Sequence, residues 1–195
     1  NTDSSGGVNM DVEEIVLGAE EKMDSAVEAL IESLQTLRTG RANPMLVDKI
    51  RVDSYGAMSP IKAVASLSVP EPRILMIQPW DKSMLAVIEK AIMTSDLGIM
   101  PAHDGNVIRL NMPEMTEDRR KDLVKVAKGR AEDGRVSVRN ARRDANTSLK
   151  KMEKDKEITE DESKKLQKTV QDKTDEYIGK IDDILGQKEK DIMEV

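Results

Sequence analysis

The sequence has 195 residues and contains no cysteine, no phenylalanine, one tryptophan, two tyrosines and one histidine. The absence of cysteine excludes disulfides, thiolate zinc sites and a cysteine nucleophile. Because aromatic residues are so few, the core must be built from Leu, Ile, Val, Ala and the twelve methionines, which suit narrow contacts between helices. No apolar run approaches the roughly 20 residues that span a bilayer, so we expect no membrane partner.

The chain also lacks the constellations that catalysis and cofactor binding require. His103 is the only histidine, and no cysteine or second histidine can complete a metal site or activate a nucleophile with it. No Gly-rich phosphate loop is present, because Gly40 stands alone before Arg41. The carboxylates fall on polar helix faces rather than in an apolar pocket. We therefore expect no enzyme activity, no catalytic residue, no metal and no cofactor.

Three segments have helical periodicity, with apolar residues three and four positions apart. The first apolar stripe consists of Val12, Val16, Ala19, Met23, Ala26, Leu30 and Leu37. The second consists of Leu123, Ala127, Ala131, Gly134, Val138, Ala141, Ala145, Leu149 and Met152. The third consists of Leu166, Val170, Tyr177, Ile181, Ile184 and Ile192. Thr116 is the predicted N-cap of the second helix, and Thr159 to Glu162 form a predicted capping box for the third.

Residues 48–111 have a different pattern, in which short β-branched runs alternate with turn residues. The predicted breaks lie at Tyr55-Gly56, at residues 69–72 and at Asp104-Gly105, where a tight hairpin is expected. One helix interrupts these strands, with Asp81 or Ser83 as its N-cap. Its predicted buried residues are Leu85, Ile88, Ala91 and Ile92.

The predicted fold is therefore α+β, a long three-helix bundle with an inserted small β/α/β domain joined by two hinge segments. We expect residues 1–9 to be a disordered leader, residues 10–40 and 116–195 to form the bundle, and residues 41–115 to form the insertion. Gly and Pro in the two connections favour hinge motion there. The predicted hinge residues are Thr39, Gly40, Arg41, Pro113 and Glu114.

Positive charge is concentrated in one segment of an acidic protein. The whole chain carries a net charge of −6, whereas residues 116–155 hold thirteen bases and eight acids. On a helical wheel one face beside the apolar stripe collects Lys121, Lys125, Lys128, Arg135, Arg139, Arg142, Arg143 and Lys150. Arginine suits bidentate phosphate contacts, so this cationic stripe predicts a phosphate-binding face, and the acidic remainder argues against indiscriminate binding of nucleic acid, DNA included. The alternative is an ordinary solvated face paired with neighbouring acids.

Trp80 and Tyr55 offer a second candidate surface for nucleic acid. Neither has a second aromatic residue beside it, as a base-stacking platform would. We therefore expect both side chains to pack in the domain.

Four segments in order closely resemble ribosome recycling factor: Leu37–Pro44, Ala86–Gly98, Glu117–Leu123 and Val138–Asn146. The similarity extends from about Met10 to the C-terminus. Gly134 departs from the strong helix former expected at its position, at a local cost of about 1 kcal/mol.

This resemblance implies a three-helix bundle with a hinged domain and binding to the post-termination ribosome. There, elongation factor G and its GTP hydrolysis drive the factor to separate the subunits. The resemblance also implies that Arg38, Arg139 and Arg142 contact large-subunit ribosomal RNA near the inter-subunit bridges, and that the hinged domain meets elongation factor G. With the cationic stripe, the expected RNA-binding residues are Arg38, Lys128, Arg135, Arg139, Arg142 and Arg143. We expect a monomer.

Two alternatives stay open on the sequence. The first is a helical scaffolding protein whose apolar stripes bind partner helices. The second concerns the compartment: the first residue is Asn and the leader is polar, which favours a mature chloroplast stromal protein over a bacterial cytoplasmic one.

Overall fold

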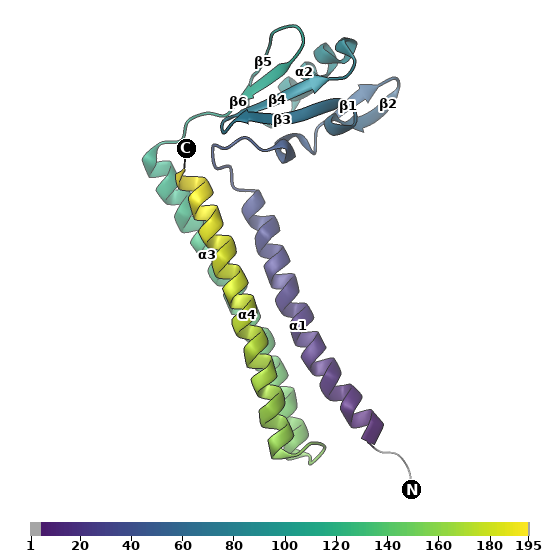
Figure 1. Ribbon diagram of the computed structural model, residues 1–195, viewed down its shortest axis with the longest axis vertical. Helices are drawn as coiled ribbons and strands as arrows, with labels where there is room; N and C mark the ends of the chain where they lie inside the picture. The colour runs from purple at the N-terminus through teal and green to yellow at the C-terminus, as the bar shows by residue number, and fades with distance from the viewer. Residues whose placement is uncertain (1–4, 195) are drawn as a thin grey trace. The chain divides into compact units, whose positions relative to one another are not determined.

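The computed structural model describes residues 5–194, which contain four α-helices, three short 3-10 helices and six strands (Figure 1). The chain divides into two compact units. One consists of the described residues through Leu37 together with Lys121–Lys190, and the other consists of Arg38–Arg120 together with the described residues from Asp191 onward. The α+β class is confirmed, with long helices in the first unit and strands in the second.

The first unit consists of three long helices: α1 (Ser5–Gln35), most of α3 (Glu117–Lys154) and most of α4 (Glu160–Met193). Residues 1–4 of the expected leader lie outside the described residues. Residues 5–9 belong to α1, so this helix starts earlier than the glycine pair at 6–7 suggested. Glycine lowers helix propensity by about 1 kcal/mol without forbidding the conformation.

The predicted caps of α3 and α4 are confirmed. Thr116 Oγ1 accepts a hydrogen bond from the backbone N–H of Arg119 at 3.1 Å. At the start of α4, the N–H of Glu162 donates to Thr159 Oγ1 at 3.1 Å, and the N–H of Thr159 donates to the Glu162 carboxylate at 3.4 Å. Both ends therefore satisfy donors that a helix leaves open.

The nine predicted stripe residues of α3 are all buried. At Gly134 the helix has no side chain, and the atoms nearest to its missing Cβ are Ile181 Cδ1 at 3.3 Å and Leu30 Cδ2 at 3.8 Å. These two residues come from α4 and α1. Gly134 therefore lies at a close contact with both neighbouring helices, which accounts for a glycine inside a long helix.

The stripes of α1 and α4 are broader than predicted. Val27 and Leu34 of α1 are buried, whereas the predicted Val16, Ala26 and Leu37 are only half-buried. In α4, Leu185 and Thr174 are buried, whereas the predicted Leu166 and Ile184 are only half-buried. The Thr174 hydroxyl donates to the Val170 carbonyl at 2.8 Å. Each helix faces two neighbours rather than one, so a single seam underestimates the buried face.

The second unit contains two antiparallel sheets and one α-helix. A hairpin of β1 (Arg51–Ser54) and β2 (Ala57–Pro60) forms the smaller sheet. The larger has the order β3-β4-β6-β5. Its strands are β3 (Ala65–Glu71), β4 (Ile74–Pro79), β5 (Pro101–His103) and β6 (Ile108–Asn111), and α2 spans Leu85–Thr94. The 3-10 helices are η1 (Pro44–Val47), η2 (Ile61–Ala63) and η3 (Lys82–Met84).

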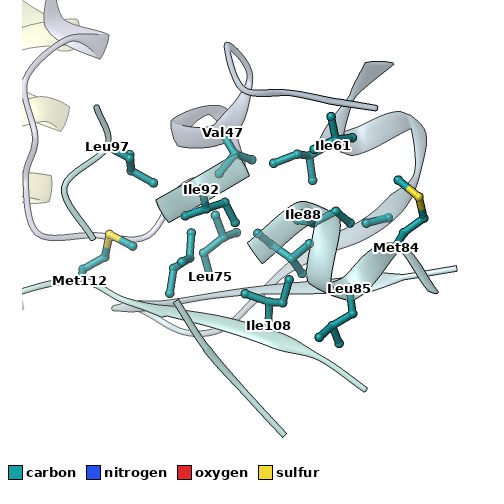
Figure 2. Packing of buried hydrophobic residues seen from close by; sticks show 14 residues of the cluster. Val47, Ile61, Leu75, Met84, Leu85, Ile88, Ile92, Leu97, Ile108 and Met112 are labelled. Carbon is teal, nitrogen blue, oxygen red and sulfur yellow. The ribbon is translucent and has the colours of Figure 1, made fainter. Parts of the chain in front are cut away.

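The core of this unit lies between α2 and one face of the larger sheet (Figure 2). Leu75 pairs with Leu110 and Ile77 with Ile108 across β4 and β6, so alternate residues of both strands point to the same face. From α2, buried Leu85, Ile88 and Ile92 cover that face, whereas the predicted Ala91 is half-buried.

Most predicted turns of the second unit are confirmed. Tyr55 and Gly56 have φ values of 51° and 87° between β1 and β2, as a two-residue hairpin turn requires. Asp81 rather than Ser83 caps η3, which leads directly into α2. The predicted break at residues 69–72 is wrong in part, because β3 continues through Glu71 with a register shift after Ser68. A proline can occupy such an irregular position because no ladder hydrogen bond is needed from it.

Candidate functional site

The cationic stripe of α3 lies beside its buried stripe, as the helical wheel predicted. Its exposed members are Lys121, Lys125, Lys128, Arg143 and Lys150. Arg135, Arg139 and Arg142 are partly buried. The stripe therefore has two classes of residue, and their contacts differ.

All three guanidinium nitrogens of Arg135 contact carboxylates, one carboxylate on α4 and one on α3 itself. Its Nε and Nη2 donate to Asp182 Oδ1 of α4 at 2.9 and 2.8 Å, and its Nη1 donates to Glu132 Oε2 at 3.1 Å. The hydrogen bond to Asp182 raises the pKa of Arg135 above its ordinary value. The side chain is 19% exposed. These contacts connect α3 to α4, and they leave Arg135 less available to an outside phosphate than its place on the wheel implied.

Glu132 bridges Arg135 and Arg139. While its Oε2 accepts from Arg135, its Oε1 accepts from Arg139 Nη1 at 3.2 Å. The hydrogen bonds from Arg135 and Arg139 hold the pKa of the Glu132 carboxyl below its ordinary value. Sequence reasoning missed this acid, which precedes the two arginines by three and seven positions. The helical spacing of i to i+3 and i to i+7 was the signal that could have identified it.

Three residues of the cationic stripe, Lys128, Arg142 and Arg143, have no acidic partner within residues 5–194. Arg142 Nη1 donates to the neutral Gln171 Oε1 at 3.3 Å. Arg143 and Lys128 are exposed, with no ion pair or side-chain hydrogen bond in the described part of the chain. Three positive charges on one helix therefore lack an acidic partner, two of them exposed and one partly exposed, which leaves them able to bind phosphate.

Arg38 belongs to the second unit, where its Nη1 donates to the Leu97 carbonyl at 2.7 Å. A different arginine, absent from the predicted stripe, contacts the end of α1. Arg130 Nη1 donates to the Ser33 carbonyl at 2.5 Å and to Thr36 Oγ1 at 2.9 Å. Arg130 was missed because its partners lie more than ninety residues away in the sequence.

The predicted hinge residues after α1 have defined contacts inside the second unit. Thr39 is buried, and Gly40 has a φ of 78°, a backbone conformation that favours glycine. Arg41 forms ion pairs with Asp191 at 3.6 Å and Glu194 at 3.5 Å. In the first connection, ion pairs therefore hold Arg41, and the backbone changes direction at Gly40.

The second connection is held by Arg73, which precedes β4. Its Nη1 donates to the Glu114 carboxylate at 2.8 Å, and its Nη2 donates to the Met112 carbonyl at 3.1 Å. The N–H of Met112 donates to the Arg73 carbonyl at 2.8 Å. The residues on either side of Pro113, Met112 and Glu114, are therefore both held by hydrogen bonds to Arg73.

The expectation that Trp80 and Tyr55 pack in the domain is wrong. The two side chains are 68% and 85% exposed, and the Tyr55 hydroxyl donates a short hydrogen bond to the Asp81 carboxylate. That hydrogen bond raises the pKa of Tyr55 and lowers the pKa of Asp81. The buried core of this unit consists of Val, Ile, Leu, Ala and Met side chains and includes neither ring.

His103 lies beside a single carboxylate, with its Nε2 3.4 Å from Glu89 Oε2. Among residues 5–194, no cluster of His, Cys, Asp and Glu has the arrangement of a metal site. Within the same range, no helix combines the length and apolar character of a membrane span.

The fold and the site define a class: a three-helix bundle with a cationic helix face and an inserted antiparallel domain. The sequence profile of the family described as "Ribosome recycling factor" matches residues 30–193. The chain belongs to the ribosome recycling factor family. Its relatives include the ribosome-recycling factor of Clostridioides difficile, with 57% identity over 90% of this chain and 95% of the relative. That of Geobacillus sp. has 55% identity over 94% of this chain and 100% of the relative.

Solved structures give the same result. A solution structure of a ribosome recycling factor is similar with a TM-score of 0.76 and 41% identity, over 95% of this chain and 98% of that one. The second has a TM-score of 0.65 and 42% identity, over 93% and 98%. It is described as models for the T. thermophilus ribosome recycling factor and the E. coli elongation factor G bound to the E. coli post-termination complex.

Proposed function

We propose that this chain acts in ribosome recycling. It binds the post-termination ribosome and, with elongation factor G and GTP hydrolysis by that partner, separates the subunits. Membership of the family supports this proposal, and so does the description of the related structure bound to a post-termination complex. The chain contributes binding and mechanical work rather than covalent chemistry, and it requires no cofactor.

The bundle is proposed to bind large-subunit ribosomal RNA near the inter-subunit bridges through α3. The observation that carries this step is the group of uncompensated charges at Lys128, Arg142 and Arg143. An arginine that is not paired within the protein can exchange water for phosphate oxygens and release counterions from the RNA. Arg139 joins this group because Glu132 uses only one of its nitrogens.

Arg135 and Arg38 have other roles in this proposal. Arg135 connects helices, and Arg38 contacts RNA only with donors that its hydrogen bond to Leu97 leaves free. A guanidinium has five N–H donors, so Arg38 retains several of them. Of the residues predicted from sequence, we therefore place Lys128, Arg139, Arg142 and Arg143 in direct phosphate contact.

The scaffolding alternative loses its basis in the apolar stripes. All nine stripe residues of α3 are buried inside the bundle, and most of those on α1 and α4 are buried with them. Stripes that pack against one another are not available to partner helices.

The inserted domain is proposed to meet elongation factor G and to move about the two connections. The turn at Gly40 and the segment at Pro113 and Glu114 are the proposed hinge residues, together with Thr39 and Arg41. The hydrogen bonds of Arg73 to Met112 and Glu114 restrict the second connection, which supports rotation about a defined point rather than free motion of a flexible linker. Residues 10–40 with 116–195 and residues 41–115 remain our proposed division of the protein into domains.

The relatives reported above are bacterial, so we propose the bacterial cytoplasm as the compartment rather than the chloroplast stroma. We propose that the chain works as a monomer.

The test of RNA contact is the double variant Arg142→Ala, Arg143→Ala. We expect weaker co-sedimentation with ribosomes, and a slope of log K against log salt that falls by about one for each lost phosphate contact. Lys164→Ala with Lys168→Ala is the matched control, because it removes two positive charges from α4 of the same bundle. Equal binding by both double variants would reject the proposed face.

A further inference from the structure

Four charged side chains form a continuous series from α4 to the proposed RNA-binding residue Arg139. Asp182 accepts two hydrogen bonds from Arg135, at 2.9 and 2.8 Å. Arg135 donates to Glu132 at 3.1 Å, and Glu132 accepts from Arg139 at 3.2 Å. The series carries two positive and two negative charges, with Asp182 at one end and Arg139 at the other.

The ion pairs of this series are expected to contribute little to the free energy of folding. The side chains of Glu132 and Asp182 are 52% and 54% exposed, and exposed pairs are screened by water and salt. Glu132 is nevertheless held at both oxygens, each by a different arginine. A carboxylate bound on both sides has few free rotamers, so its position is defined by Arg135 and, through Arg135, by α4.

We infer that Glu132 is a positioning residue for Arg139, holding its guanidinium in the orientation that receives a phosphate of ribosomal RNA. This inference rests on the proposed function. A free arginine side chain samples many rotamers and loses that freedom when it binds. By holding Arg139 at Nη1, Glu132 removes part of this loss before the RNA arrives. Asp182 and Arg135 hold Glu132 in turn.

The geometry favours positioning over competition between Glu132 and the RNA. Only Nη1 of Arg139 contacts Glu132, so Nε and Nη2 stay available for a phosphate. Arg135 differs, because Nε, Nη1 and Nη2 all contact carboxylates. A phosphate can therefore bind Arg139 while the bond to Glu132 persists.

The two roles predict opposite effects when Glu132 loses its charge. Simple electrostatics predicts that removing a carboxylate near RNA strengthens binding, because a repulsion disappears. Positioning predicts weaker binding, because Arg139 becomes disordered. The direction of the change in affinity therefore separates them.

The experiment measures ribosome affinity of Glu132→Gln against Asp133→Asn. Asp133 is the next residue of α3, is exposed, and has no ion pair or side-chain hydrogen bond within residues 5–194. Both substitutions remove one negative charge from the same turn. We expect Asp133→Asn to bind as tightly as the parent or tighter, and Glu132→Gln to bind about three- to tenfold more weakly. Binding of Glu132→Gln that equals or exceeds that of Asp133→Asn would overturn the inference.

A double-mutant cycle with Arg139→Ala distinguishes positioning from a general structural defect. If Glu132 acts through Arg139, Glu132→Gln causes no further loss of affinity once Arg139 is Ala. A loss that persists in the Arg139→Ala background overturns the inference. The proposed RNA contact of Arg139 is tested separately. Full ribosome affinity of Arg139→Ala would show that Arg139 does not contact the RNA, and it would overturn the inference about Glu132 as well. Weak binding by Arg139→Ala with normal binding by Glu132→Gln would overturn the inference alone.

Discussion

Arg130 caps the end of α1 by donating from Nη1 to the Ser33 carbonyl at 2.5 Å, although the two residues lie 97 positions apart. The same nitrogen donates to Thr36 Oγ1 at 2.9 Å. The last carbonyls of a helix have no partner within it, and a cation near them is favourable to the helix dipole. Arg130 thereby supports the end of α1, in addition to the Thr36 N–H and hydroxyl, which donate to the same Ser33 carbonyl at 3.2 and 2.7 Å.

Replacing Arg130 with Ala should lower the free energy of unfolding by about 1 kcal/mol, because a charged hydrogen bond to the backbone is lost. Amide hydrogen exchange at Thr36 and Leu37 should accelerate, since both amides donate to carbonyls of the last turn of α1. Lys125→Ala is the control, an exposed lysine of the same helix without a contact in the described residues. Equal exchange rates in both variants would contradict the capping role.

Gly40→Ala should destabilise the protein by about 1–2 kcal/mol, because the φ of 78° strains any residue with a Cβ. The new Cβ would also lie 3.4 Å from Met115 Cγ. Gly129→Ala is the control: this glycine is exposed inside α3 with no atom within 4 Å of the new Cβ, so about 1 kcal/mol of stabilisation is expected. Chemical denaturation measures both changes.

A second substitution at Gly40 tests the proposed hinge. A bulkier residue at Gly40 should lower subunit splitting more than ribosome binding, because binding depends on α3 and splitting depends on motion at the joint. Sedimentation of subunits and co-sedimentation with ribosomes give the two quantities. Equal losses in both assays would count against hinge motion.

Gly134→Ala should stabilise the protein less than Gly129→Ala does. The gain in helix propensity, about 1 kcal/mol, is offset because the new Cβ lies 3.3 Å from Ile181 Cδ1. Removing that methyl with Ile181→Val should restore part of the gain. A double-mutant cycle measured by denaturation checks this coupling, and an identical gain in both backgrounds would show that the close contact is relieved at no cost.

Neither tyrosine should titrate at the ordinary value of about 10. Burial, followed by the nearby Asp24, raises the pKa of Tyr177 to about 12, and the hydrogen bond to Asp81 raises that of Tyr55. Because the folded state favours the neutral phenol of Tyr177, its contribution to stability is complete below pH 10 and is lost as the pH rises from about 10 to about 12. Phenolate absorbance measures this, with Tyr177→Phe isolating Tyr55. A transition of half the tyrosine signal near 10 in the folded protein would contradict it.

Trp80 should report an aqueous environment in the native state. Its side chain is 68% exposed and it is the single tryptophan of the chain. The native emission spectrum should resemble that of the unfolded protein, and a soluble quencher should act on both with similar efficiency. Blue-shifted native emission that is protected from quenching would place the ring in contact with other groups.

Much of the fold could be predicted from the sequence because its signals are local. The stripe of α3 was predicted residue by residue, since one helix with small residues in its seam has a clear period. The caps at Thr116 and Thr159 and the turn at Tyr55-Gly56 depend on a few adjacent residues. The stripe of α1 was less accurate, because its second neighbour widens the buried face to include Val27 and Leu34.

The functional site was predicted less completely than the fold. The sequence indicated which helix carries the positive charge, and the spacing of Arg139, Arg142 and Arg143 indicated its face. It did not indicate that Arg135 turns toward α4, because Asp182 lies 47 residues away. The exposure of Trp80 and Tyr55 was missed for a related reason: whether a ring is buried depends on how the remaining core fills.

The sequence by itself determined the three amphipathic helices, the presence of an inserted domain of strands and one helix, and the location of the positive charge on α3. Periodicity, capping and turn chemistry act over a few residues, so they can be read along the chain. Only the tertiary structure decided which of those charges remain free. An arginine is available to a phosphate when carboxylates leave some of its N–H donors free, and the carboxylate that occupies Nε and Nη2 of Arg135 is brought there by the packing of α4 against α3.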